Sequence, residues 1–200
     1  MMETTRSDAV PALGLTVPAE RVACFFPLLQ KGFVIRARLG SPVRAFLREE
    51  LGLSGEYVEA RIQTVFLDGK PVDDIDRALL GEGSTLALAP AMPGLMGAML
   101  RRGGYYAPMR SGITHRDGGA PQGAGEGHIT VKLFGTALRE LGPALLARGV
   151  VVDGGDLAQL LAGLPDDCRG SLGSPVGLEG RTTVLLRVAA APGAKQGRGG

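Results

Sequence analysis

The residues best suited to binding chemistry are three arginines and two tyrosines in one short segment. Arg101, Arg102 and Arg110 are interleaved with Tyr105 and Tyr106, and methionines lie among them. Guanidinium groups form forked hydrogen bonds to carboxylates and phosphates, and they stack on aromatic rings. The pattern predicts contact with an anionic ligand or with a protein partner. The alternative is a basic surface segment that folds over a sheet, with its Met and Tyr side chains covering apolar area.

Other reactive residue types are sparse and scattered. The histidines are His115 and His128, and the cysteines, Cys24 and Cys168, are far apart in sequence. No Ser-His-Asp order, metal-ligand spacing or phosphate loop is present, so neither catalysis nor a metal or other cofactor is expected. The acidic stretch 73–76 offers carboxylates for a cation, but a solvated loop is the simpler interpretation. Arginines without a recognised motif do not predict nucleic-acid binding.

Composition fits compact modules joined by glycine-rich segments. The chain has 200 residues, a net charge of +2, 44% hydrophobic residues and 32 glycines. The first twenty residues have no charged region followed by an apolar one, and no run approaches the roughly 20 apolar residues that span a bilayer. We therefore expect a cytoplasmic protein that does not contact a membrane. Modules of this size have small cores, which favours association with a partner.

The pattern of residues 21–96 predicts a strand pair, a helix and two further strands. An apolar run at 22–29, with Pro27 suggesting an edge or bulge, and the alternating run 33–39 predict the first two strands. Ser41 and Pro42 then predict a helix start, with Ser41 as the cap. Val43, Phe46, Leu47 and Leu51 share the apolar face of that helix. The last two strands are predicted at 60–67 and 85–89.

The rest of the chain predicts a spacer and a second module. Residues 97–127 divide into the basic, apolar segment and a flexible glycine-rich linker, whereas 1–20 and 191–200 are predicted to be disordered or flexible. Residues 128–190 predict a divergent α+β module. Its strands are expected near 129–134, 150–152 and 182–188, with a helix at 157–164 capped by Asp156.

The stretch from Val65 to Pro90 resembles the back half of a β-grasp sulfur carrier. It reads as a strand, a tight turn at Asp68-Gly69, an acidic loop, a turn at 81–83 and a second strand. The carrier family includes the small subunit of molybdopterin synthase (MoaD) and the thiamine sulfur carrier (ThiS). Residues 133–134 followed by 138–141 (Leu-Phe, then Leu-Arg-Glu-Leu) resemble the opening of the molybdopterin carrier. The resemblance implies an α+β, ubiquitin-like β-grasp fold, with a mixed sheet packed on a helix.

The same resemblance implies a function and a reactive end. Such carriers end in a diglycine whose carboxylate is adenylated and converted to a thiocarboxylate, so the partner would be an adenylating or biosynthetic enzyme of the molybdopterin or thiamine pathway. Gly199 and Gly200 supply that pair at the end of this sequence. An internal pair, Gly103-Gly104, would need proteolysis to be exposed. The alternative function is a β-grasp module without carrier chemistry, which binds a protein or an anionic ligand through the 101–110 segment.

Overall fold

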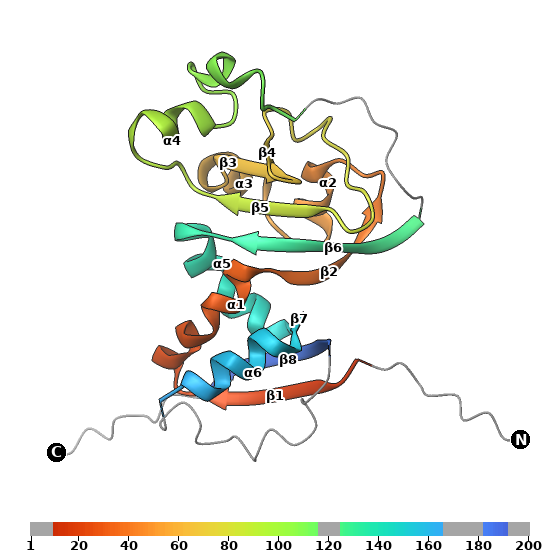
Figure 1. The fold of residues 1–200 in the computed structure, drawn as a ribbon, viewed down its shortest axis with the longest axis vertical. Coiled ribbons are helices and arrows are strands. Elements are labelled where there is room, and N and C mark those ends of the chain that lie inside the picture. The colour runs from red at the N-terminus through yellow and green to blue at the C-terminus, as the bar shows by residue number, and fades with distance from the viewer. Residues whose placement is uncertain (1–9, 116–124, 166–181, 192–200) are drawn as a thin grey trace, which may run out of the picture. The chain divides into compact units, whose positions relative to one another are not determined.

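The computed structural model describes residues 10–115, 125–165 and 182–191, and it is an α+β protein (Figure 1). The α+β class predicted from the sequence is therefore confirmed. The chain divides into two compact units, one made of residues 1–25 and 143–200, and the other of residues 26–142. We call these the outer-segment unit and the central unit. The chain passes from one unit to the other after Phe25 and again inside helix α5 (Gly135–Arg148), before Pro143.

In the central unit the strands are in the order β2-β6-β5-β3-β4. Its strands are β2 (Phe33–Leu39), β3 (Thr64–Leu67), β4 (Lys70–Pro71), β5 (Thr85–Ala89) and β6 (Gly125–Leu133). β6 is antiparallel to β2 and parallel to β5, whereas β3 is antiparallel to both β5 and β4. In β6, Ile129, Val131 and Leu133 are buried and the residues between them are more exposed, as the alternation in the sequence predicts.

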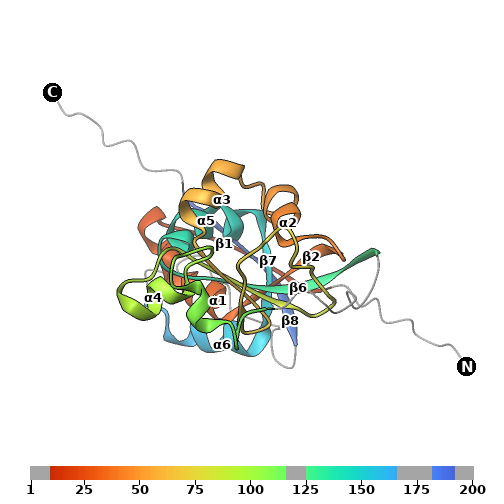
Figure 2. The ribbon, with the colours of Figure 1, turned by 90° about the horizontal axis from the view of Figure 1, so that it is seen from above.

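Two short helices cover this sheet. Figure 2 shows α2 (Val43–Glu49) and α3 (Gly55–Arg61) together on one side of it. Phe46 and Leu47 are buried, as the helical spacing predicts. The predicted helix start is wrong by one residue, because α2 begins at Val43, Pro42 takes the cap position, and Ser41 Oγ donates to Arg38 O instead. Helix α3 replaces the first part of the strand predicted at 60–67.

The turn on which the carrier resemblance depends has the expected local structure. Asp68 and Gly69 form the two-residue loop between β3 and β4, with φ of 51° and 76°. Positive φ at both positions is the requirement of a type I′ turn, which Asp-Gly meets at low cost. The Asp68 carboxylate also accepts the Thr85 N–H at 2.7 Å, which ties the turn to β5. The turn predicted at 81–83 is also present, with the Ser84 N–H bonded to Gly81 O at 3.2 Å.

The predicted strand at 22–29 is wrong. Residues Ala19–Phe25 form the 3-10 helix η1, and Phe26–Lys31 form α1. A short apolar run satisfies a buried helix as well as a strand, and Pro27 is tolerated in the first helical turn. The antiparallel neighbour of β2 is therefore β6, which starts far along the chain. The module boundary expected at residue 128 is corrected accordingly, since the central unit continues to Gly142.

In the outer-segment unit the strands are in the order β1-β8-β7. β8 (Thr183–Ala190) is parallel to β1 (Ala12–Val17) and antiparallel to β7 (Val150–Asp153). Residues 12–17 are thus ordered, contrary to the disorder expected for 1–20, because alternate side chains such as Leu15 and Val17 are buried. Helix α6 (Gly154–Gly163) is capped by Asp153, not by Asp156 as predicted, and residues 138–141 lie within α5 instead of a turn.

Candidate protein-binding surface

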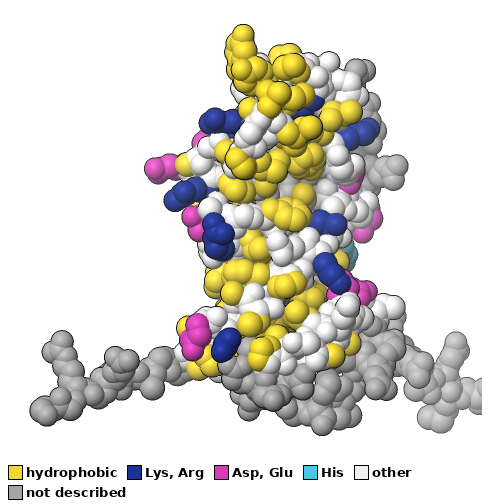
Figure 3. Space-filling model, turned by 60° about the vertical axis from the view of Figure 1, so that its left-hand side comes forward, with side chains coloured by type: hydrophobic (Ala, Val, Ile, Leu, Met, Phe, Trp, Pro, Cys, Tyr) yellow, Lys and Arg dark blue, Asp and Glu magenta, His cyan; other side chains and the backbone are white. Residues whose placement is uncertain are grey.

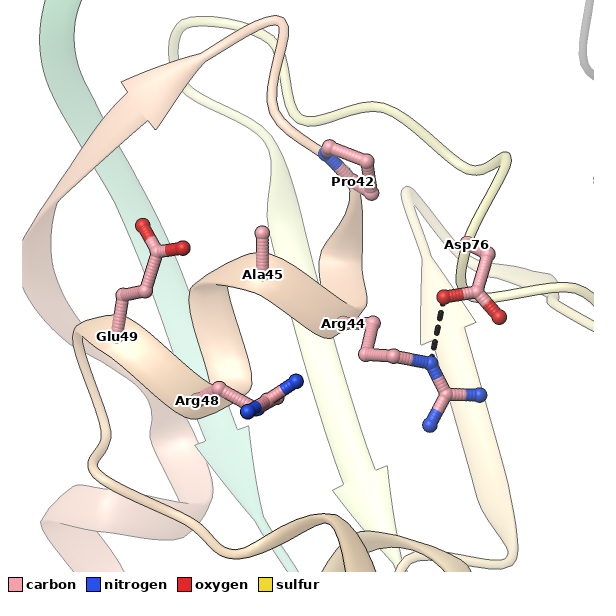
Figure 4. Close-up of a pocket in the computed structure, with 6 residues that line it drawn as sticks. All are labelled: Pro42, Arg44, Ala45, Arg48, Glu49 and Asp76. Carbon is pink, nitrogen blue, oxygen red and sulfur yellow. Dashed lines mark hydrogen bonds and ion pairs between the residues drawn. The ribbon is translucent and has the colours of Figure 1, made fainter.

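Two pockets of the central unit are lined by arginines and carboxylates. One, with a volume of about 420 Å³, lies beside α2 and is lined by Pro42, Arg44, Ala45, Arg48, Glu49 and Asp76 (Figure 4). Arg44 points toward Asp76 and is hydrogen-bonded to it, so part of its charge is already neutralised. A second, of about 370 Å³, is also lined by both arginines and glutamates. Among the described residues, no three side chains of metal-binding type come together, and no helix is long and apolar enough to cross a bilayer.

A cluster of exposed apolar side chains is the most unusual surface of the described chain. Eight large hydrophobic side chains are exposed in the described residues, and six of them lie between residues 94 and 114. These six, which we call the apolar cap, are Leu95, Met96, Tyr105, Tyr106, Met109 and Ile113. Tyr105 is 91% exposed. Figure 3 shows hydrophobic side chains gathered over this segment at the upper end of the view. Contiguous exposed apolar patches commonly mark interaction sites.

Two short helices carry the cap. Helix α4 (Gly94–Leu100) begins after Pro93, which occupies the cap position, and the 3-10 helix η2 (Ala107–Arg110) has Pro108 in its first turn. Gly97 lets α4 lie against the preceding chain, because a Cβ at this position would be 2.0 Å from Met92 O. Ala107 is buried, so η2 has a face directed inward. The segment that carries the cap is therefore folded. Gly97 and Ala107 occupy its close contacts, and Pro93 and Pro108 lie at the starts of its two helices.

Arg110 holds the segment that carries the cap (residues 94–114, the cap segment) from a buried position. The residue is 3% exposed. Its guanidinium donates to Met99 O at 2.6 Å, to Thr114 Oγ1 at 2.7 Å and to Asp73 Oδ1 at 2.6 Å. The same Asp73 oxygen accepts the Gly103 N–H at 3.1 Å. One arginine thus joins α4, the end of the segment and the acidic loop.

Arg102 forms a second anchor, at the start of β3. Its backbone N–H donates to Gln63 O at 2.8 Å, and its guanidinium donates to Glu59 Oε2 at 3.0 Å. Only 11% of the Arg102 side chain is exposed. Glu59 in turn pairs with Arg44 of α2, which also pairs with Asp76. The four charged side chains alternate in sign and connect α2, α3, the acidic loop and the cap segment.

This network changes the acidity of its members. The hydrogen bonds that Arg44 donates to Asp76 and Glu59 raise the pKa of Arg44 above its ordinary value. The hydrogen bond from Arg44, together with the charge of Arg102, holds the pKa of Glu59 below its usual range. Elsewhere in the unit, burial and a hydrogen bond to Glu140 raise the pKa of Tyr57. Each group keeps its ordinary charge at neutral pH, so none is poised for proton transfer.

The predicted contact residues separate into two groups. Arg101, Tyr105 and Tyr106 are exposed, and the two rings pack edge to face with centroids 5.1 Å apart. Arg102 and Arg110 point inward to carboxylates, so the expectation that all three arginines face a ligand is corrected for these two. The carboxylates Glu59 and Asp73 were not singled out from the sequence as their partners. Gly199, Gly200 and Cys168 lie outside the described residues.

Comparison with known proteins yields no assignment. Neither the family models, nor the curated proteins, nor the solved structures include a match to this chain.

Proposed function

We propose that this chain is a non-catalytic protein-binding module and that the apolar cap is its contact surface. The observation that carries the proposal is the clustering of six exposed apolar side chains on a segment held by two ion pairs whose arginines are largely buried. Interface cores are enriched in Tyr, Met and Arg and depleted in acidic residues. The cap segment has that composition, with Arg101 exposed among tyrosines and methionines and no Asp or Glu between residues 83 and 116.

The anchoring of the segment supports binding in a second way. A loop that must become ordered when it binds loses affinity through the entropy of its backbone and side chains. Here Arg102 and Arg110 fix the segment at two points, and the His115 N–H adds a bond to Pro71 O at 2.8 Å. The exposed side chains therefore sit on a backbone that is already held in place. The segment is less suited to binding a small anionic ligand than a protein, because Glu59 and Asp73 already pair with two of its three arginines.

Site-specific photo-crosslinking tests this proposal. Benzoylphenylalanine is placed at Tyr105 in cells that express the chain, and the matched control carries it at Phe134, an exposed aromatic residue outside the cap. We expect one discrete protein adduct at position 105, its loss when Met109 is also changed to Ser, and none at 134. The crosslinked protein is identified by mass spectrometry and the binding is repeated with purified components. No adduct at position 105, or equal adducts at both positions, would refute the proposal.

A second candidate function is the sulfur carrier. Its support is the segment from β3 to β5, where the strand, the Asp68-Gly69 turn and the second strand have the structure that the carrier resemblance implies. A β-grasp fold and the use of the Gly199-Gly200 carboxylate are part of this candidate. Incubation with an adenylating enzyme, ATP and a sulfur donor should then increase the intact mass by about 16 Da, the sulfur-for-oxygen difference that the carrier resemblance implies, and deletion of Gly200 should abolish the increase. An unchanged mass in the wild type would eliminate this candidate.

A further inference from the structure

We infer that the occupant of the apolar cap is a second copy of this chain, in a two-fold symmetric dimer. The inference rests on the proposed function, since it names the partner of the same surface. In a two-fold dimer one patch meets an identical patch, so the patch must be compatible with itself in charge, area and shape. The first two conditions follow from the described residues.

Charge is the first condition. A segment with three arginines would repel a second copy of itself, yet Arg102 is paired with Glu59 and Arg110 with Asp73. Of these three arginines, Arg101 is the one that is exposed to solvent. A single arginine does not need a carboxylate partner here, because the face of a tyrosine ring also binds a guanidinium. Tyr105, almost fully exposed, offers such a ring to the Arg101 of the other copy.

Area is the second condition. A stable interface takes roughly 800 Å² from each partner, and its core in homodimers is more apolar than the ordinary surface. The six cap side chains are between 41% and 91% exposed. Large side chains present on the order of 150–250 Å² each when fully exposed, so six of them supply most of that area. Polar backbone and Arg101 at the margin can supply the remainder.

A membrane surface fits the same residues less well. Peripheral membrane proteins combine inserted apolar side chains with several basic residues that attract anionic headgroups. The internal pairing of Arg102 and Arg110 removes most of that attraction from the described cap. The same pairing that weakens lipid binding lowers the repulsion between two copies, so the charge arrangement favours the dimer.

Sedimentation equilibrium of the purified full-length chain tests the inference. We expect a monomer–dimer equilibrium in the wild type. The Tyr105→Ser/Met109→Ser variant should raise the dissociation constant of the dimer roughly tenfold or more, because central aromatic residues dominate interface energies. The matched control, Phe134→Ser, removes an exposed aromatic side chain outside the cap and should leave the constant unchanged. Circular dichroism of each variant verifies that the fold is retained.

The outcomes separate this inference from the proposed function. A wild-type chain that stays monomeric at all accessible concentrations, or a dimer that the cap variant leaves intact, overturns the dimer. If the Tyr105 crosslink then identifies another protein, the proposed function survives without the dimer. If the cap variant instead abolishes flotation with vesicles of phosphatidylglycerol and phosphatidylcholine while the chain is monomeric, both proposals fall. A crosslink from position 105 to a second copy supports both.

Discussion

Arg110 Nη2 lies 2.6 Å from Asp73 Oδ1, and the arginine side chain is only 1% exposed. The two residues are 37 positions apart in sequence, and their contact holds the cap segment against the acidic loop. A buried guanidinium that loses its carboxylate keeps its desolvation cost without compensation. The main consequence of this ion pair is therefore the loss of stability that we expect when one partner is removed.

Asp73→Ala should lower the free energy of unfolding by about 3 kcal/mol, the lower end of the cost of breaking a buried pair, because Asp73 is itself 35% exposed. Amide hydrogen exchange in residues 94–114 should accelerate at the same time, since both the arginine and the Gly103 N–H lose an acceptor. Urea unfolding and exchange mass spectrometry measure the two effects. Glu49→Ala removes an exposed carboxylate of the same unit and should change stability by less than about 0.5 kcal/mol. Equal effects of the two substitutions would show that the pair is not an anchor.

The Glu59 carboxylate should make stability depend on pH below neutrality. Its pKa is lowered from 4.5 by the hydrogen bond from Arg44, so the folded state binds this proton less readily than the unfolded state. The contribution is present above pH 4.5 and is lost as the pH falls below that value, through the lower pKa of the folded protein. Glu59→Gln should therefore lower the melting temperature at pH 7 and have a smaller effect at pH 3. A gap between the two proteins that is the same at both pH values would contradict the assignment.

Phe46→Ala should cost roughly 3–5 kcal/mol, the usual range for removal of a buried aromatic side chain. Phe46 is 1% exposed on the inner face of α2. Arg48→Ala on the same helix is the matched control, because that side chain is exposed and loses no core packing. Thermal or urea unfolding measures both, and an unchanged Phe46→Ala curve would show that this face of α2 does not form the core.

Local patterns in the sequence were sufficient for the elements whose partners are close in the chain. The Asp68-Gly69 turn and the apolar face of α2 depend on backbone preference and helical spacing, which are legible over a few residues. The run at 22–29 has no such period, so nothing local distinguishes a buried strand from α1 and η1. The pairing of β6 with β2 joins residues that are far apart in the sequence, such as Ile35 and Ile129. No pattern within a few residues indicates such a pairing.

The same limit applies to the candidate surface. The composition around Arg101 and Tyr105 predicted a basic, apolar segment distinct from the flexible linker, and α4 and η2 are the helices of that segment. Whether each arginine faces outward depends on Glu59 and Asp73, which lie 43 and 37 residues from Arg102 and Arg110. The three arginines carry the same charge, so charge alone does not show which of them faces solvent. The distinction between anchors and contact residues therefore required the fold.

Limited trypsin digestion should cut the native chain first after Arg116 and spare Arg101 and Arg102. Arg116 precedes the glycine-rich stretch 118–127, whereas the Arg102 backbone is hydrogen-bonded to Gln63 and its side chain to Glu59. A protease needs a locally opened, extended backbone, so a bonded and buried site is protected. Mass spectrometry of early fragments identifies the cut. Rapid cleavage at Arg101 or Arg102 would mean that the cap is not held in place, and the binding proposal would fall with it.

The fragment that folds should be 26–142 and not 21–96. The shorter fragment lacks β6, whose buried Ile129, Val131 and Leu133 lie between β2 and β5 in the sheet. Without β6 both neighbouring strands lose a hydrogen-bonded partner, and the apolar faces they share with it become exposed. Circular dichroism and urea unfolding should show a cooperative transition for 26–142 and a broad or absent one for 21–96. Val131→Asp in the longer fragment is the matched control, because it keeps chain length and should abolish the transition by placing an unpaired charge in the core. A cooperative transition in 21–96 would mean that β6 is dispensable and that the sequence boundary at 96 marks a true module.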